Sequence, residues 1–156
     1  MMLLRLTALA LTALILVPSG AHLFELPRKI GLDRDAYSAV QQIYAGWAFF
    51  AVPILGAVLA NGALFIAERR LRPPAARAAL IASILIILSN AVFFLWVFPA
   101  NQATVNWTQT PDNWETLRRQ WEYGHAVTAL LVFVALLMTG WALIQGHPGQ
   151  NERAFP

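Results

Sequence analysis

Hydrophobic residues gather in four long runs that short polar segments separate. The runs cover about residues 6–26, 45–67, 78–100 and 126–144. Each is close to the roughly 20 apolar residues that a helix needs to cross the hydrocarbon core of a bilayer. The pattern therefore predicts an all-α fold, a four-transmembrane-helix bundle in which residues 1–156 form a single domain.

The composition indicates that lipid, not water, surrounds most of the chain. Of the 156 residues, 58% are hydrophobic and 12% are charged, whereas soluble domains carry about 25% charged residues. The net charge of +3 suits a nucleic-acid partner in a soluble protein, but we expect no nucleic acid here. We expect a multi-pass protein of the cell membrane, with the lipid bilayer as its surroundings and a homo-oligomer as a candidate assembly. The absence of cysteine excludes disulfides, thiolate metal sites and cysteine nucleophiles.

Basic residues indicate an orientation for the bundle. Four arginines lie in or beside the short loop between the second and third runs: Arg69, Arg70, Arg72 and Arg77. An excess of Lys and Arg in short loops marks the cytoplasmic side. Both termini are then expected to be cytoplasmic, and the long third loop at residues 101–122 is expected to lie outside. In an alternative interpretation the first run is a cleaved secretory signal, which leaves three spans.

The tryptophans predict where the membrane boundaries lie. Trp47, Trp96, Trp107, Trp114 and Trp121 fall near the outer boundary and Trp141 near the inner one. Interfacial anchoring is the role we expect for most of them. Trp114, Leu117, Trp121 and His125 also follow one another at intervals of three and four residues. This spacing places them on one helical face, so the fourth helix is expected to begin ahead of its apolar run.

Two histidine–glutamate pairs are the candidate chemical groups. His22 and Glu25, and Glu122 and His125, are each one helical turn apart. The first helix ends and the fourth begins on the same side, so all four side chains are expected at a similar depth. Imidazole and carboxylate together suit iron, manganese or zinc, and ionisable groups at membrane depth are functional candidates because they are costly. Further carboxylates are scarce, so a mononuclear metal or a metal-free acid–base pair fits better than a dinuclear centre.

Two other interpretations of these residues stay open. In one, Glu25 and Glu122 form interfacial ion pairs with Arg28 and Arg119, while the histidines bond to loop carbonyls. In the other, His22 and His125 are the axial ligands of a haem held within the bundle.

A second group of polar residues predicts a ligand site. Tyr37, Gln41 and Tyr44 follow helical spacing at the outer end of the second helix. We expect them to line a polar mouth over an apolar cavity, together with Asn101, Asn106 and Trp107 of the long loop. A few polar groups around an apolar space orient a mostly hydrophobic ligand. The alternative is an ordinary hydrogen-bond network at the membrane surface.

Two stretches, AHLFELPRKIGLDRDAYSAVQQIYAGWAFF and NQATVNWTQTPDNWETLRRQWEYGHAV, resemble the anthrone-oxygenase-like integral membrane family, largely a domain of unknown function. The resemblance spans nearly the whole chain. Its most specific part is the series Asn101, Asn106, Trp107, Trp114, Arg118, Trp121 and His125.

The resemblance implies oxidation of an anthrone to an anthraquinone by molecular oxygen, with no established cofactor. It carries over His125, Asn101, Asn106 and Trp121 as catalytic residues. Relatives often have an arginine shortly after the histidine where this chain has Thr128, a departure that bears on the specific substrate.

The resemblance therefore implies a membrane oxidoreductase that acts on a lipophilic, aromatic small molecule. His125, poised by Glu122, is the expected general base, since the ordinary histidine pKa of roughly 6.5 lies near working pH. The alternative is a non-enzymatic membrane protein, either a small-molecule transporter or a helper subunit that binds a ligand or partner.

Overall fold

Helices make up nearly all of the part of the chain that the computed structural model describes, residues 1–145, and no β-strand occurs in that part. Four long helices form the bundle in this part: α1 (Met2–Lys29), α3 (Ala51–Glu68), α4 (Pro73–Val92) and α6 (Trp114–Gln145). Shorter elements extend and connect them: α2 (Arg34–Gln41), the 3₁₀ turns η1 (Gln42–Tyr44) and η2 (Trp47–Phe50), the π-helical turn η3 (Phe93–Val97), and α5 (Phe98–Ala103).

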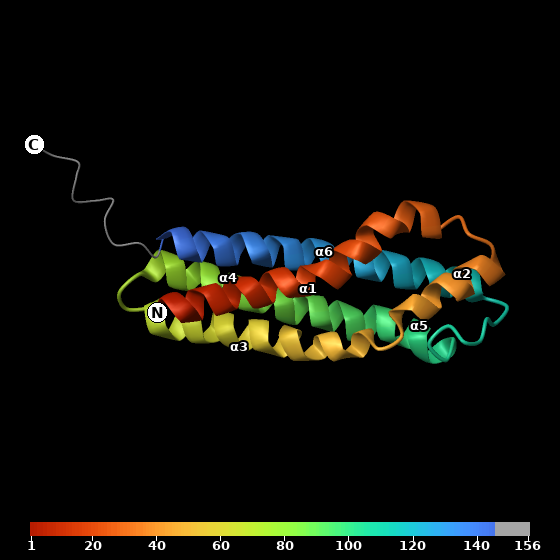
Figure 1. Cartoon of the computed structure of the whole chain (residues 1–156), viewed down its shortest axis with the longest axis horizontal. Helices are drawn as coiled ribbons and strands as arrows, with labels where there is room; N and C mark the ends of the chain where they lie inside the picture. The colour runs from red at the N-terminus through yellow and green to blue at the C-terminus, as the bar shows by residue number, and fades with distance from the viewer. Residues whose placement is uncertain (146–156) are drawn as a thin grey trace, which may run out of the picture.

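The long helices lie side by side along the long axis of the molecule (Figure 1). The start of α1 and the end of α6 lie at one end, which we call the N-terminal end, whereas α2 and α5 cover the other, the α2 end (Figure 1). Four stretches are long and apolar enough to cross a membrane: Met2–Lys29, Trp47–Glu68, Pro73–Ala103 and Trp114–Gln145. For residues 1–145, the predicted all-α fold with four helices long and apolar enough to cross a membrane is therefore confirmed. Its cytoplasmic and outer sides stay predictions.

The helices run past the apolar segments that revealed them in the sequence. The fourth begins at Trp114, twelve residues before its apolar run starts at Ala126. Backbone hydrogen bonding continues into the polar segment because the face carrying Trp114, Leu117 and Trp121 stays buried. The prediction that this helix begins ahead of its apolar run is confirmed.

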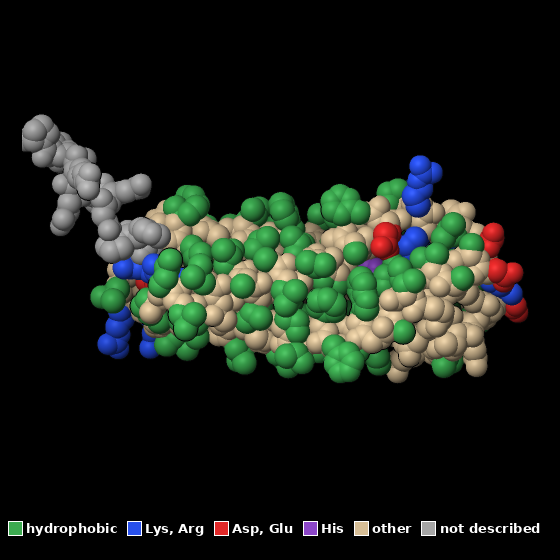
Figure 2. All heavy atoms as spheres, viewed as in Figure 1, with side chains coloured by type: hydrophobic (Ala, Val, Ile, Leu, Met, Phe, Trp, Pro, Cys, Tyr) green, Lys and Arg blue, Asp and Glu red, His purple; other side chains and the backbone are tan. Residues whose placement is uncertain are grey.

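The bundle turns large hydrophobic side chains outward and packs small ones inside. Exposed leucine, isoleucine, valine and phenylalanine side chains cover its length, while charged groups gather toward the two ends (Figure 2). Alanines such as Ala57, Ala79 and Ala135 are buried between the helices. Small interior residues let helices approach closely in lipid, so the molecule is built as a multi-pass membrane protein.

One polar cluster ties three helices together within the bundle. Asn61 of α3 is fully buried and donates to Thr12 Oγ1 of α1 at 3.1 Å. Thr139 of α6 donates to Asn61 Oδ1 at 3.0 Å. Such interhelical hydrogen bonds stabilise membrane bundles modestly, and every member here has a partner.

An aromatic core fills the α2 end. Trp107, Trp114 and Trp121 are buried there with Tyr37 and Leu117, so the expectation that most tryptophans are interfacial anchors is wrong for these three. The loop after α5 folds back over the bundle through three residues with positive φ, Val105, Asn106 and Trp107. This turn carries the indole of Trp107 inward against the Tyr37 ring, at 4.9 Å between centroids.

Candidate functional site

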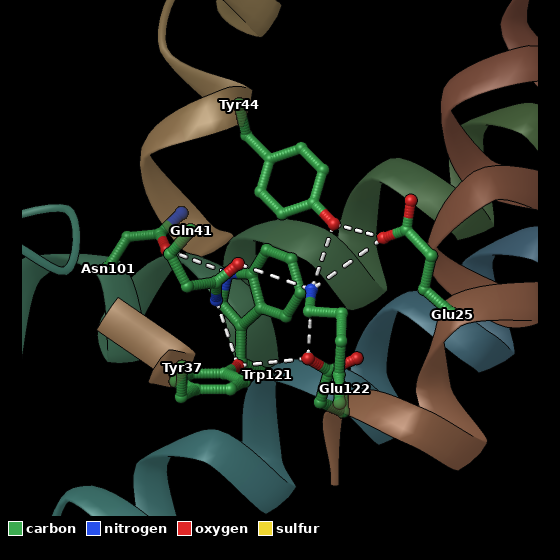
Figure 3. A network of polar contacts seen from close by, with 8 residues as sticks. Glu25, Tyr37, Gln41, Tyr44, Asn101, Trp121 and Glu122 are labelled. Atoms are coloured by element: carbon green, nitrogen blue, oxygen red, sulfur yellow. Dashed lines mark hydrogen bonds and ion pairs between the residues drawn. The ribbon is translucent and has the colours of Figure 1, made fainter. Parts of the chain in front are cut away.

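Lys29, the last residue of α1, is the centre of a buried polar network at the α2 end. Figure 3 labels the residues that surround its ammonium. Its side chain is 4% exposed. The ammonium donates to Glu122 Oε1 at 3.0 Å, to the Tyr44 hydroxyl at 3.0 Å and to Gln41 Oε1 at 3.2 Å. One cation therefore joins α1 to α2, η1 and α6.

Glu122 of α6 is the counter-charge at the inner side of this network. Its side chain is 0% exposed. Its Oε1 also accepts a hydrogen bond from the Tyr37 hydroxyl at 2.9 Å, and that hydroxyl accepts one from Gln41 Nε2 at 2.8 Å. Its Oε2 is buried without a hydrogen-bond partner. A carboxylate in this position is compensated by Lys29 and by no other cation that contacts it among the described residues.

Tyr44 and Glu25 form the outer side of the network. The Tyr44 hydroxyl donates to Glu25 Oε2, which also lies 3.9 Å from Lys29 Nζ. The side chain of Glu25 is 37% exposed, so the network reaches solvent here.

Both tyrosines of the network are neutral hydrogen-bond donors. Burial raises the pKa of Tyr44 above its usual range, and donation to the Glu25 carboxylate raises it further. Burial likewise raises the pKa of Tyr37, and the charge of Glu122 adds to the effect. The two hydroxyls therefore keep their protons throughout the ordinary pH range.

Aromatic rings enclose the lysine. Its ammonium lies 4.5 Å from the ring centroid of Trp121 and 4.5 Å from that of Tyr44, within the range of cation–π attraction. Trp121 is held in turn, because its indole Nε1 donates to Asn101 Oδ1 at 2.8 Å.

A pair of histidines lies beside this network. The ring centroids of His22 on α1 and His125 on α6 are 4.1 Å apart, with the planes inclined by 36°. Trp121 packs against both, at 4.2 Å from His125 and 4.8 Å from His22. Tyr44 lies 4.5 Å from His22. The indole of Trp121 contacts Lys29 and both histidines, and the phenol of Tyr44 contacts Lys29 and His22. These two rings join the lysine network and the histidine pair into one site.

The remaining walls of the histidine pair come from outside α1 and α6. Trp47 of η2 lies 5.3 Å from His22, and Phe93 of η3 lies 6.0 Å from His125, between ring centroids. His22 is buried and its Nδ1 has no hydrogen-bond partner, whereas His125 is half-buried. The two imidazole rings are therefore surrounded mainly by aromatic side chains.

A close helix contact fixes η3 against α6 next to His125. A Cβ atom added to Gly124 would lie 2.6 Å from Cγ2 of Val97, nearer than real Cβ atoms approach. Glycine at this position lets the π-helical turn lie directly on α6, and π turns of this kind are frequent at functional sites. The position of η3 also places Phe93, its first residue, beside His125.

The structure brings most of the sequence-predicted residues together. The residues in the network or in direct contact with it are His22, Glu25, Tyr37, Gln41, Tyr44, Asn101, Trp107, Trp121, Glu122 and His125. Asn106 is exposed in the positive-φ turn, and its backbone N–H donates to Asn101 O at 2.7 Å. The expected polar mouth is in fact a packed network in which the side chains bond to one another.

The two predicted pairs are arranged differently from the expectation. Glu122 bonds to Lys29 and Tyr37 rather than poising His125. The expected ion pairs of Glu25 and Glu122 with Arg28 and Arg119 are replaced by ion pairs of both glutamates with Lys29. The Nη2 atom of Arg119 lies instead 3.9 Å from Oε2 of Glu115.

The same geometry bears on the metal and haem hypotheses. Within residues 1–145, no three or more His, Asp or Glu side chains are grouped so as to hold one metal ion, so His22, Glu25, Glu122 and His125 are not gathered into a ligand set. The rings of His22 and His125 pack against each other, which leaves no space between them for a haem.

Lys29 is the residue of this network that the sequence patterns do not single out, because it follows the end of the first apolar run. The spacing held the information: His22, Glu25 and Lys29 are three and four residues apart and so share one helical face. The helix continues to Lys29 past Pro27, which carries this basic residue onto the face of the other two.

The fold and the site define a class: a multi-pass helical membrane protein with an ion-paired polar network and a histidine pair at one end of the bundle. Comparison with protein-family models, curated proteins and solved structures finds no match.

Proposed function

We propose that the chain is a membrane oxidoreductase that acts on a lipophilic aromatic molecule, with His125 as the general base. The observation that supports this function is the histidine pair itself, in which His125 is half-buried and His22 is buried. Trp121, Tyr44 and Phe93 wall this pair. Flat ligands pack well on aromatic faces, and imidazole is the side chain best suited to take a proton near neutral pH.

The position of the pair favours access from the lipid. Figure 2 shows a histidine at the side surface of the bundle, beside acidic and basic side chains and next to the hydrophobic band. An apolar molecule dissolved in the bilayer reaches this surface sideways without crossing water. The charged groups beside it offer polar contacts for a keto or phenol oxygen.

The resemblance to anthrone-oxygenase-like proteins suggests the reaction. His125 removes a proton from the methylene carbon of an anthrone, which leaves an electron-rich carbanion. The carbanion forms a carbon–oxygen bond with molecular oxygen, and the resulting peroxide takes up a proton. Its oxygen–oxygen bond then breaks as the second hydrogen leaves the same carbon. One ketone and one water are formed, so oxygen is the oxidant and no further reductant is needed.

We also propose that the α2 end faces the outside of the cell membrane and that both termini are cytoplasmic. The arginines at the opposite end support this orientation, since Arg69, Arg70 and Arg72 follow directly after α3.

A second candidate function is a non-enzymatic ligand-binding or helper subunit. The observation that favours it is the mutual bonding of Lys29 with Glu122, Tyr44 and Gln41, which stabilises the α2 end without any reacting molecule. A transporter is less well supported, because Asn61 bonds to Thr12 and Thr139 as a helix-packing residue.

An oxygen-uptake assay decides between these functions. Detergent-purified protein is mixed with anthrone, and oxygen consumption and anthraquinone formation are followed together. The wild type is expected to turn over and His125→Ala to lose at least about 100-fold in rate, the typical contribution of a general base. His147→Ala is the matched control, since it is the same substitution near the C-terminus. Anthrone binding without product in the wild type favours the helper function, and full activity of His125→Ala removes His125 as the base.

A further inference from the structure

A continuous chain of polar contacts joins the interior of the α2 end to its surface. Glu122 Oε1 lies 3.0 Å from Lys29 Nζ, and Lys29 Nζ lies 3.0 Å from the Tyr44 hydroxyl. That hydroxyl donates to Glu25 Oε2. The exposed fraction of the side chain rises from 0% at Glu122 to 37% at Glu25. Figure 3 shows Glu122, Tyr44 and Glu25 around the ammonium that links them.

We propose that Glu122, Lys29, Tyr44 and Glu25 form a proton path that carries protons between the buried interior of the bundle and water at the α2 end. Each neighbouring pair is in hydrogen-bond contact, and the chain crosses from α6 through α1 and η1 back to α1.

The direction of the hydrogen bonds suits outward transfer. Lys29 donates to Tyr44 and Tyr44 donates to Glu25. A proton leaves Lys29 Nζ for the Tyr44 oxygen while the Tyr44 proton moves to the Glu25 carboxylate, which releases it to water. Glu122, a carboxylate in its ion pair with Lys29, first takes up a proton from the interior of the bundle. It then gives a proton to Lys29 and returns to the carboxylate. The net change is one proton moved from the interior through Glu122 to solvent.

The inner end of the path has an atom free to take a proton. Glu122 Oε2 is buried and has no hydrogen-bond partner, and Glu122 lies one helical turn before His125 on α6. The idea that the path removes the proton taken up by His125 rests on the proposed function. Proton transfer between Glu122 and Glu25 is independent of that function.

The surroundings define where the path runs and where it does not. The titratable and charged groups that face it are His22 on α1, Tyr37 on α2, and Arg118 and His125 on α6. Tyr37 is a side branch, because beyond Glu122 its hydroxyl bonds, within residues 1–145, only to the buried amide of Gln41. That amide does not titrate, and its oxygen accepts a hydrogen bond from Lys29. Tyr44 keeps its hydroxyl proton, since burial and Glu25 raise its pKa, and so it relays protons rather than storing charge.

The two tyrosines give a matched pair of variants. Tyr44→Phe removes the relay hydroxyl and keeps the ring that contacts His22 and Trp121. Tyr37→Phe also removes a hydroxyl bonded within the network, yet it leaves the path intact. Far-ultraviolet circular dichroism and detergent unfolding check that both variants fold.

The experiment follows the protonation of Glu122 by infrared spectroscopy after a rapid pH change, with neither ligand nor turnover. The carboxylic acid band that Glu122→Gln abolishes reports this group. Tyr44→Phe is expected to slow the response at least about tenfold while its end point is unchanged, and small diffusible acids are expected to restore the rate. Tyr37→Phe is expected to respond as fast as the wild type.

Three results would overturn the proton path. They are an unchanged rate in Tyr44→Phe, an equal slowing in Tyr37→Phe, or no change in Glu122 protonation across the pH range in which the bundle stays folded. Because no anthrone is present, none of these results depends on whether the chain oxidises a substrate. A chain that conducts protons but does not consume oxygen retains the path and loses the proposed function.

Discussion

Replacing Lys29 with Met is expected to destabilise the bundle strongly. Methionine keeps most of the apolar stem and lacks the ammonium, so the main change is the loss of one positive charge. Glu122 is left as a carboxylate whose side chain is 0% exposed and whose countercharge at 3.0 Å has gone. Removal of one partner from such a buried pair costs about 3–5 kcal/mol.

The double variant Lys29→Met with Glu122→Gln separates lost charge from lost packing. A neutral amide at position 122 still accepts the hydrogen bond of Tyr37 through its carbonyl oxygen, and it no longer buries a charge. We expect the double variant to recover about 2 kcal/mol relative to Lys29→Met alone. The control is Arg119→Met, because Arg119 and Glu115 are 64% and 58% exposed and such a pair contributes less than about 1 kcal/mol.

The assay is equilibrium unfolding in mixed detergent micelles of increasing sodium dodecyl sulfate content. Circular dichroism reports the helices and tryptophan fluorescence reports the site, since the Trp121 ring lies 4.5 Å from the Lys29 ammonium. A free energy of unfolding for Lys29→Met within about 1 kcal/mol of the wild-type value, the effect expected of a solvated pair, would refute the buried ion pair. It is also refuted if the double variant is no more stable than the single one.

Two further predictions concern packing and pH. Gly124→Ala places a methyl group 2.6 Å from Cγ2 of the short, stiff Val97 side chain, and we expect overpacking to cost about 1–3 kcal/mol in the same unfolding assay. Gly140→Ala, where nothing lies within 4 Å of the added atom, should be neutral or slightly stabilising, and equal effects at the two positions would contradict this packing argument. Burial raises the folded-state pKa of Tyr37 and Tyr44, so the unfolded chain loses these hydroxyl protons at lower pH than the folded chain. The free energy of unfolding is therefore expected to be unaffected by these tyrosines below about pH 10 and to decline as the pH rises above it. Tyr37→Phe is expected to flatten this decline in unfolding measured below and above that pH, and an unchanged slope would show that Tyr37 does not contribute to it.

The fold was predictable because hydropathy alone reports on spans in a membrane. Backbone groups in lipid must bond within the segment, so a long apolar run becomes a helix. The positions of the two histidines along their helices were predictable for the same reason. Their contact was not, because hydropathy does not fix helix rotation. The rotation here follows from the packing of Trp121 against both rings and of Tyr44 against His22.

The ion pair of Glu122 with Lys29 could not be predicted from the sequence. The apolar run ended before Lys29, which made a buried lysine look like a solvated loop residue. The burial of Lys29 depends on α2 and η1 folding back to supply Gln41 and Tyr44 as acceptors. That return is a tertiary contact between polar segments, and it leaves no periodic mark in the sequence. The inward orientation of Trp107 could not be predicted from the sequence either, because it depends on three consecutive residues with positive φ.

The central claim is that His125 takes a proton from a lipophilic aromatic ligand, and isotope exchange tests it most directly. Anthrone is incubated with the protein in deuterated buffer without oxygen, and deuterium at its methylene carbon is measured by mass spectrometry. We expect rapid exchange with the wild type and only background exchange with His125→Ala. Equal exchange with both proteins, or none above background with the wild type, would contradict the claim.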